Sequence, residues 1–468
     1  MDGLEQWIEQ VNSAVHSFVW GPVMICILVG AGIWFTIGTR FFQVRKIGAI
    51  CGTLGSVFKR KKDRDAGAIS PFQAVSAALA GTLGVGNIVG VATAITIGGP
   101  GAVFWMWVSA FFGMMTKYAE VVLAVHYRER NGRGEWVGGP MYYLKNGLHS
   151  KFLAGAFAVF GVCASFGIGN MTQANAISSY SQNVFGVPAA VTGVIIAIIT
   201  GLVIIGGIKR IAGVTEKIVP FMAILYIVGA GAVIVVHYKA VPDALSAIFS
   251  GAFAFEPLAG GIAGSAMARA IQVGISKGVF SNEAGLGSAS IVHAAADTPH
   301  PARQGLWGAF EVFADTLVVC TITALAVLSC GLWENPEITG VTLTQKTFES
   351  VFGPFGGAFL AVSIIFFAFA TIIGWSYYGE RCGEYLFGAK FLMPYKVVYV
   401  LMTAVGAVLE LTLVWDLSDT LNGLMAIPNL IGLFALSGMV FKLTKEEFPG
   451  RRALAAQKRG RKKQRMRR

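Results

Sequence analysis

The chain has 468 residues, of which 55% are hydrophobic and 13% are charged, and its mean hydropathy is +0.64. Soluble domains carry about 25% charged residues, whereas the stretches 66–116, 152–208 and 350–379 contain no Asp, Glu, Lys or Arg. This composition excludes a water-soluble globular protein and indicates a chain that crosses a membrane repeatedly. The apolar stretches are too long for barrel strands and do not alternate, so we expect spanning helices of about 20 residues each.

The N-terminus does not resemble a cleavable signal peptide, because residues 1–17 contain three acidic residues and no Lys or Arg. The apolar segments that follow predict eleven spans, in chain order 18–39, 71–97, 100–126, 153–180, 187–208, 218–238, 257–276, 306–332, 352–378, 396–415 and 420–441. We therefore expect an all-α polytopic membrane protein with about eleven transmembrane helices.

Lys and Arg are distributed unevenly between the two sides of these spans. Of 37 such residues, 33 fall in one alternate set of loops and the tail 442–468, while the opposite set holds only Lys239 and Lys346. The positive-inside rule then predicts an N-terminus outside and a C-terminus in the cytoplasm. The net charge of +12 owes much to the tail, which we expect to contact anionic lipid rather than nucleic acid.

The second span contains a weak point for a helix. Four glycines, a threonine and an asparagine lie within ten residues: Gly81, Thr82, Gly84, Gly86, Asn87 and Gly90. Each glycine in a helix interior costs about 1 kcal/mol relative to alanine. An interruption would free backbone groups that can bind a cation or a carboxylate. Close packing between helices explains the same glycines equally well.

The seventh span has the same character, with glycine-rich sequence at 260–272 and 274–278. It lies five spans after the second, so the two weak helices run in opposite directions. This spacing predicts a five-plus-five inverted repeat with two broken helices, and a site between them near the middle of the membrane. The single transporter domain, 1–468, would then contain an extra N-terminal helix, 18–39, two repeats, 71–240 and 241–441, and the basic tail.

Three motifs resemble those of the alanine/glycine:cation symporter family. They are the glycine- and tryptophan-rich stretch 98–113, the Phe-Ser-Asn-Glu-Ala-Gly-Leu-Gly-Ser stretch 280–288, and the run from Gly81 to Asn87. The resemblance covers essentially the whole chain. It implies a symporter on the fold of the bacterial leucine transporter that imports alanine or glycine with sodium, with serine and glutamine as alternatives.

The same fold implies roles for individual residues. Gly84-Val-Gly-Asn87 matches its Gly-Leu-Gly-Asn turn, whose glycine amides meet the substrate carboxylate, and 366–371 matches a Phe-Phe-Ala-x-x-Thr run. The sodium ligands would be the carbonyls of Ala80, Leu83 and Ala368 and the Thr371 hydroxyl, an oxygen-only set that suits a hard cation. Ile372 stands where the fold often has a second hydroxyl, so the site would use fewer ligands or a water.

Further candidates for the substrate site lie in spans two, four and seven. Gln173 could hold a zwitterion without adding charge, with interhelical hydrogen bonding as the alternative. Met267 and Ile271 could wall the side-chain pocket, although ordinary packing explains them nearly as well. The predicted substrate-binding residues are Thr82, Gly84, Gly86, Asn87, Gln173, Gly264, Met267 and Ile271.

The acids of the eighth span, Glu311 and Asp315, are interpreted as structural, with Arg303 or Arg269 as partners, although a proton relay is conceivable. The residues near 283–297 show no chelating spacing, so no metal other than sodium and no cofactor is expected. No catalytic motif of an intramembrane enzyme is present, and paired broken helices suit alternating access better than a channel. We expect a multi-pass inner-membrane protein that works as a monomer.

The topology can be tested with single cysteines. A cysteine at the N-terminus should react with an impermeant maleimide added to intact cells, and one at the C-terminus should not, because the Lys- and Arg-rich loops stay in the cytoplasm. Protection of both termini would contradict eleven spans.

Overall fold

The computed structural model describes the whole chain except residues 1, 57–66, 254–261, 410–411 and 450–468. Its α-helices are α1 (Asp2–Val19), α2 (Pro22–Gly38), α3 (Phe42–Arg45), α4 (Ile47–Gly52), α5 (Pro71–Thr82), α6 (Val89–Gly98), α7 (Gly101–His126), α8 (Pro140–Asn146), α9 (Lys151–Phe166), α10 (Thr172–Phe185), α11 (Ala189–Ile204), α12 (Gly207–Val236), α13 (Val241–Ala252), α14 (Ile262–Asn282), α15 (Ser290–His293), α16 (Pro301–Val312), α17 (Thr321–Ser329), α18 (Gly340–Phe352), α19 (Pro354–Phe387), α20 (Leu392–Val408), α21 (Thr412–Leu424), α22 (Ala426–Ala435) and α23 (Ser437–Glu447).

Short segments of other kinds complete the described chain. The 3-10 turns are η1 (Thr53–Ser56), η2 (Val85–Asn87), η4 (Tyr238–Ala240), η6 (Leu332–Glu334) and η7 (Ala389–Phe391), and the π-helical segments are η3 (Gly167–Met171) and η5 (Phe313–Cys320). The strands β1 (Glu129–Arg130) and β2 (Trp136–Val137) form one small antiparallel hairpin. This hairpin is an addition to the predicted all-α architecture.

Seven helices of the described chain are long and apolar enough to cross a membrane. An eighth is added if Val414–Ala435 and Ser437–Glu447, which meet at 61°, form one bent span, and two apolar helices, Val89–Gly98 and Ala189–Ile204, are shorter. Most predicted spans coincide with helices to within a few residues. The multi-pass helical architecture is therefore confirmed, while the count of eleven stays a prediction.

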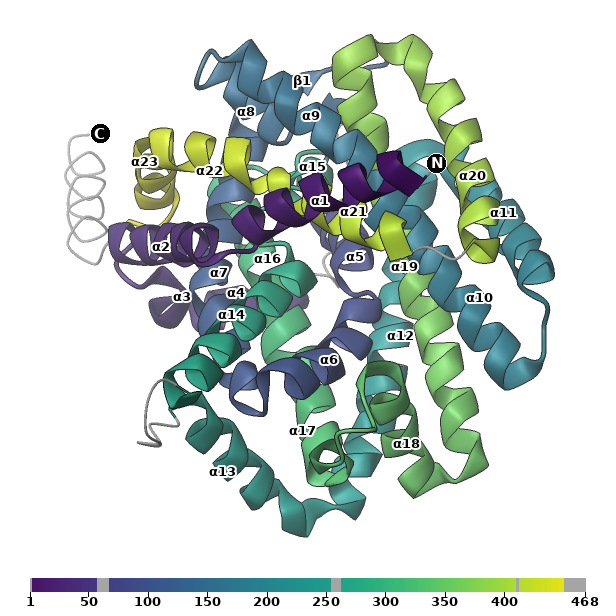
Figure 1. Ribbon diagram of the computed structural model, residues 1–468. Coiled ribbons are helices and arrows are strands. Elements are labelled where there is room, and N and C mark those ends of the chain that lie inside the picture. Colours follow the sequence, from purple (N-terminus) through teal and green to yellow (C-terminus); the bar gives the residue numbers. More distant parts are fainter. Residues whose placement is uncertain (1, 57–66, 254–261, 410–411, 450–468) are drawn as a thin grey trace.

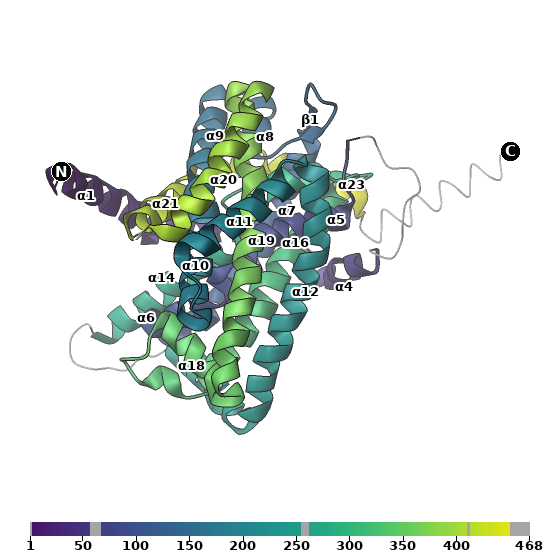
Figure 2. The ribbon, with the colours of Figure 1, turned by 90° about the vertical axis from the view of Figure 1, so that its right-hand side faces the viewer.

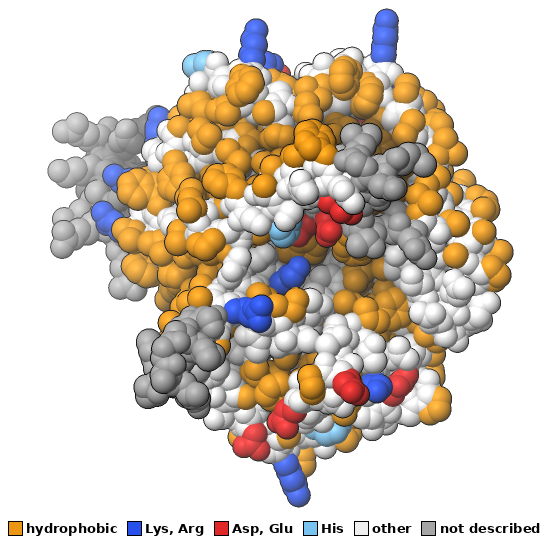
Figure 3. All heavy atoms as spheres, in the orientation of Figure 1, with side chains coloured by type: hydrophobic (Ala, Val, Ile, Leu, Met, Phe, Trp, Pro, Cys, Tyr) orange, Lys and Arg blue, Asp and Glu red, His pale blue; other side chains and the backbone are white. Residues whose placement is uncertain are grey.

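Two long helices, α12 and α19, form the spine of the molecule and run side by side (Figure 2). The first half of the second predicted span, α5, packs against both of them (Figure 1). Apolar side chains cover much of the face seen in Figure 3. The exposed large apolar residues include Ile198, Val228 and Leu401, each more than half exposed. Such a surface is suited to lipid contact, because acyl chains are as apolar as these side chains.

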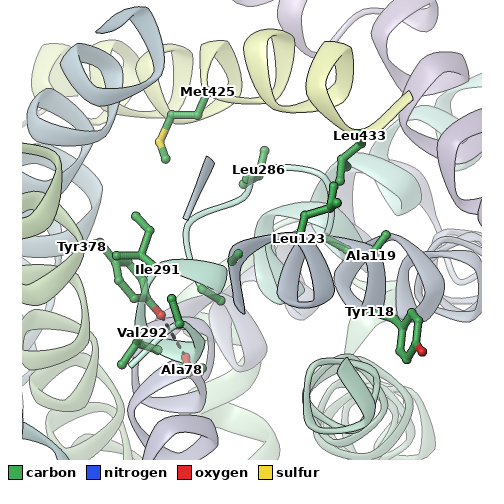
Figure 4. Packing of buried hydrophobic residues seen from close by; sticks show 14 of the residues in the cluster. Ala78, Tyr118, Ala119, Leu123, Leu286, Ile291, Val292, Tyr378, Met425 and Leu433 are labelled. Atoms are coloured by element: carbon green, nitrogen blue, oxygen red, sulfur yellow. Dashed lines mark hydrogen bonds between the residues drawn. The ribbon is translucent and has the colours of Figure 1, made fainter. Parts of the chain in front are cut away.

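Glycines let α5 and α19 approach closely. A Cβ built on Gly374 would lie 2.7 Å from the backbone nitrogen of Gly81, so neither helix could tolerate a side chain at this crossing. One turn away, the Tyr378 hydroxyl donates a hydrogen bond to the Ala78 carbonyl at 3.4 Å, with Ile291 of α15 beside it (Figure 4). The structure therefore supports close packing between helices as the role of Gly81.

The seventh predicted span differs from its prediction in its position. The expected helix, 257–276, begins in residues outside the described chain, and α14 continues without interruption to Asn282. The glycines at 274 and 278 lie inside this helix, where they allow the backbone of α7 to come close. The described part of this glycine-rich stretch, 262–282, therefore contains no break, and a break is found in the residues that follow Asn282, while Gly260 and Gly261 lie outside the described residues.

Candidate functional site

The second predicted span is interrupted inside its glycine-rich stretch. Helix α5 ends at Thr82, and Leu83 leaves helical geometry with φ −74° and ψ 88°. Gly84 is extended, with φ −126° and ψ −161°, and the single turn η2 follows before α6 begins at Val89. The chain thus forms two half-helices joined by a short irregular segment, here called the first break (residues 83–88).

Asn87 redirects the backbone hydrogen bonds of the first break. In an uninterrupted helix, each amide donates to the carbonyl four residues earlier. The Gly84 amide instead donates to the side-chain oxygen of Asn87 at 2.9 Å, and the Asn87 amide donates to the Gly84 carbonyl at 3.2 Å. The carbonyls of Ala80 and Leu83 are thereby released from their helical partners. The Gly84 amide, assigned above to the substrate carboxylate, is engaged by Asn87 in this arrangement.

Helix α19 presents Thr371 to the first break. A Cβ built on Gly84 would lie 2.8 Å from the Thr371 hydroxyl, which is buried and donates to the Phe367 carbonyl at 3.0 Å. Its lone pairs remain available as acceptors. Ala368, one turn earlier, belongs to the same buried cluster as Ala80 and Leu83. The structure therefore places Thr371 against Gly84 of the first break, and it places Ala80, Leu83 and Ala368 in the same large buried cluster.

Gln173 also lies close to the first break. The π-helical segment η3 precedes α10, and the Gln173 amide nitrogen donates to the Ile168 carbonyl, five residues back, at 3.0 Å. Its oxygen Oε1 is buried and has no hydrogen-bond partner among the described residues. A Cβ built on Gly84 would lie 3.8 Å from it. A buried acceptor without a donor is costly, and this one is close to the extended backbone of the first break.

The remaining predicted residues of the second span lie on either side of Gly84. Thr82 is buried, and its hydroxyl donates a long hydrogen bond to the Ala78 carbonyl at 3.4 Å. Gly86 faces the ring of Phe280 in α14, since a Cβ built on Gly86 would lie 3.4 Å from two ring atoms. Phe280 was not among the predicted site residues, although it begins the second family motif.

Asp315 connects the first break to two other elements. The Asn87 side-chain nitrogen donates to Asp315 Oδ1 at 2.6 Å and to the Ser281 hydroxyl at 2.9 Å. Ser281 and Thr316 donate to Asp315 Oδ2 at 2.8 and 2.7 Å. The carboxylate therefore fixes Asn87, which in turn fixes Gly84. The sequence analysis recognised Asp315 only as an intramembrane acid, because pairing across more than 200 residues leaves no local pattern.

A second break follows α14. Glu283, Gly285 and Gly287 have positive φ values of 55°, 98° and 84°, and the short helix α15 begins at Ser290. The freed groups of Gly285 find side-chain partners: its amide donates to Glu120 Oε1 at 2.8 Å, and its carbonyl accepts from Asn429 at 2.8 Å. The family motif 280–288 thus contains all but the last residue of this break, called the second break (residues 283–289).

Three predicted substrate residues lie elsewhere on α14. Met267 and Ile271 are partly buried and precede Ser281 by fourteen and ten residues, about 21 and 15 Å along a helix that rises 1.5 Å per residue. Gly264 lies further along α14, in a stretch whose side-chain surroundings are not described. The structure does not bring Met267 and Ile271 to the first break, because the second break occurs later in the chain than expected.

Glu311 also has partners other than those predicted. Arg303 forms an ion pair with Glu447, and Arg269 is exposed. Glu311 instead contacts Lys117 and a histidine of α15. Within the described residues, no group of three or more His, Cys, Asp or Glu side chains is placed to hold a metal ion.

Comparisons with known proteins agree with this geometry. The family model for the sodium:alanine symporter family matches residues 5–462. The sodium/alanine symporter AgcS of Methanococcus maripaludis is 48% identical over 94% of this chain and 97% of its own length. A probable sodium/glutamine symporter, GlnT, of Bacillus subtilis is 39% identical over 95% and 91% of the two chains.

Solved structures support the fold. The transporter MhsT, crystallised with L-phenylalanine, superposes with a TM-score of 0.55 at 16% identity and covers 81% of this chain and 89% of its own. A manganese transporter of Eremococcus coleocola superposes with a TM-score of 0.51 at 11% identity, over 82% of each chain.

The chain described here is a multi-pass transporter that couples amino-acid movement to sodium, and it is not an enzyme. The match of the family model over nearly the whole length leads to one conclusion: the chain belongs to the sodium:alanine symporter family.

Proposed function

We propose that this protein imports a small neutral amino acid, alanine or glycine, together with sodium by alternating access, and that both bind at the first break. The observation that carries the proposal is that the carbonyls of Ala80 and Leu83 lose their helical donors next to Gly84, where a built Cβ would lie 2.8 Å from the Thr371 hydroxyl. Oxygen ligands of this kind suit a hard, singly charged cation. They arise only because Asn87 accepts the Gly84 hydrogen bond that a continuous helix would have used.

The proposed sodium site contains no carboxylate of the protein. Its ligands are the carbonyls of Ala80, Leu83 and Ala368 and the hydroxyl of Thr371, so dipoles meet most of the charge. The carboxylate of the bound amino acid supplies the nearest negative charge. Each ligand should therefore tighten the binding of the other by the same factor.

The amino acid has complementary partners at the first break. Its ammonium group can donate to Gln173 Oε1, the buried acceptor without a partner. Its carboxylate can lie toward Gly86 at the start of the second half-helix, whose N-terminus carries partial positive charge. Thr82 and Asn87 lie on either side of Gly84 and Gly86 in the chain. Gly264, Met267 and Ile271 remain proposed for the substrate path, at a distance from this point.

Small side chains suit the space around Gly84. A methyl group added to Gly84 itself would already meet Thr371 at 2.8 Å, so the amino acid lies in a crowded setting. Among the relatives, one name specifies alanine and another glutamine. We favour alanine and glycine, with serine and glutamine as the alternatives.

The cellular setting completes the proposal. We place the protein in the cell (inner) membrane as a monomer, with the N-terminus outside and with inverted repeats at 71–240 and 241–441. The basic tail, 442–468, would lie against anionic lipid, since polybasic segments beside a spanning helix are attracted to acidic headgroups.

Replacement of Thr371 by valine tests the sodium site. Thr371→Val keeps the shape but removes an oxygen ligand worth about 1–2 kcal/mol. The sodium concentration for half-maximal alanine uptake in proteoliposomes should rise about ten-fold. Thr347→Val is the matched control, because Thr347 of α18 is equally buried and also donates to a carbonyl four residues back. Unchanged sodium dependence in purified Thr371→Val would remove Thr371 from the site.

A competition panel tests the amino-acid site. Alanine and glycine should each suppress uptake of labelled alanine strongly, while tryptophan and arginine should leave it nearly unchanged, because the space at Gly84 is small and the site carries no acid for a guanidinium. Serine and glutamine, measured alongside, define the upper size limit. Strong competition by arginine would contradict the proposed pocket.

A further inference from the structure

Charged side chains gather behind the second break, where no ligand has been placed. The buried charge cluster consists of Lys117 and Glu120 of α7, Glu283 of the second break, His293 of α15 and Glu311 of α16. Each of the five is at most 3% exposed. Charged groups are rarely buried inside a membrane protein without a function, and the transport site proposed above uses none of them.

Glu311 lies at the centre of the cluster. Its Oε2 is 3.1 Å from His293 Nε2, and its Oε1 is 3.7 Å from Lys117 Nζ. The other ring nitrogen of His293 is 2.9 Å from the Gln304 amide. Lys117 Nζ and Glu311 Oε1 are fully buried, yet neither has a hydrogen-bond partner within the described chain. The ion pair between Lys117 and Glu311 is therefore long and is not supported by hydrogen bonds at these two atoms. The two carboxylate oxygens of Asp315, in contrast, accept three hydrogen bonds.

The charges of the cluster do not balance. Lys117 is its one permanent cation, while Glu120, Glu283 and Glu311 are acids, with Asp315 close by. The other titratable groups that face it are Tyr143 of α8 and Tyr378 of α19, while Cys320 of η5 faces Asp315. The part of α5 that packs on α15 contains no titratable side chain. Lys277 of α14 lies over the Phe280 ring instead. Several buried carboxylates cannot all stay ionised beside one ammonium, so the cluster must hold protons.

Hydrogen bonds indicate where a proton can enter and leave. Glu120 Oε1 is occupied by the Gly285 amide and Asn429, and Glu283 accepts from Ser288. Glu311 alone contacts a histidine, the side chain whose second ring nitrogen can take up a proton. We propose that His293 and Glu311 form a proton-binding site, and that the bound proton holds the second broken helix in the arrangement seen here.

The proton acts through α15. With the proton bound, the imidazolium donates to Glu311, and the cluster loses one unit of its excess negative charge, which strengthens the attraction between α15 and α16. Without the proton, Glu311 retains only Lys117 as a cation. Because α15 follows the second break directly, loss of the proton weakens one of the contacts that hold this segment, beside those that Arg128 makes to the Ala294 and Ala296 carbonyls, and so eases the movement that alternating access requires. Acidification therefore slows transport, and this holds whichever amino acid is carried.

The pH profile of uptake tests the site. At saturating sodium, the initial rate of uptake in wild-type proteoliposomes should fall about ten-fold as the pH is lowered from pH 8 to one pH unit below the midpoint of the profile. At that pH a single proton site is about nine-tenths protonated, so only about a tenth of the protein transports at the full rate. His293→Gln keeps an amide that can donate to Glu311 but cannot titrate, so its profile should be flat. His300→Gln, which alters a histidine near the surface pair with Glu447, should retain the wild-type profile. A wild-type profile in His293→Gln would overturn the proposal.

A second measurement needs no variant. Hydrogen exchange of residues 283–296 in purified wild-type protein, corrected for the intrinsic pH dependence of exchange, should be several-fold faster at about pH 8 than at about pH 6. Equal corrected rates would also overturn the proton site. Because this readout requires no transport, it separates failure of the proton site from failure of the proposed symport, which would appear as absent sodium-driven alanine accumulation at every pH.

Discussion

The arrangement depends on one constraint: backbone groups released inside a membrane protein must find partners, because lipid offers none. The two breaks meet it differently. At the second, the side chains of Glu120 and Asn429 bind the amide and carbonyl of Gly285. At the first, Asn87 satisfies the Gly84 amide but leaves the carbonyls of Ala80 and Leu83 without their helical donors. At the second break the protein itself binds the freed groups of Gly285, whereas at the first break we propose that a cation binds the freed carbonyls.

The breaks are joined rather than independent. Asn87 of the first break contacts Ser281 at the end of α14 and Asp315 of η5, so its side chain lies where three elements meet. The same end of α14 continues directly into the second break. A change in the first break caused by an ion or an amino acid is thus connected by three hydrogen bonds to the helix that precedes the second. This linkage places the proposed transport site and the buried charge cluster in one physical network.

Much of the fold could be predicted from the sequence. Long uncharged stretches located the spans, and the density of glycines near Gly84 located the first break, because these features depend on local composition. The break found after α14 lies later in the chain than the described part of the glycine-rich stretch, since Gly274 and Gly278 serve packing against α7 and the positive φ values occur at 283–287. The assignment of Met267 and Ile271 to the substrate site stays a prediction. Most partners of Asp315 and Glu311 lie on other helices, so the spacing of residues along one span could not predict them.

The central claim is that sodium and the amino acid share the first break and stabilise each other there. It is tested most directly by equilibrium binding of labelled alanine to the purified protein over a range of sodium concentrations, and of sodium over a range of alanine concentrations. The account predicts that sodium lowers the dissociation constant for alanine and that alanine lowers that for sodium by the same factor. Alanine affinity that does not change with sodium would contradict it.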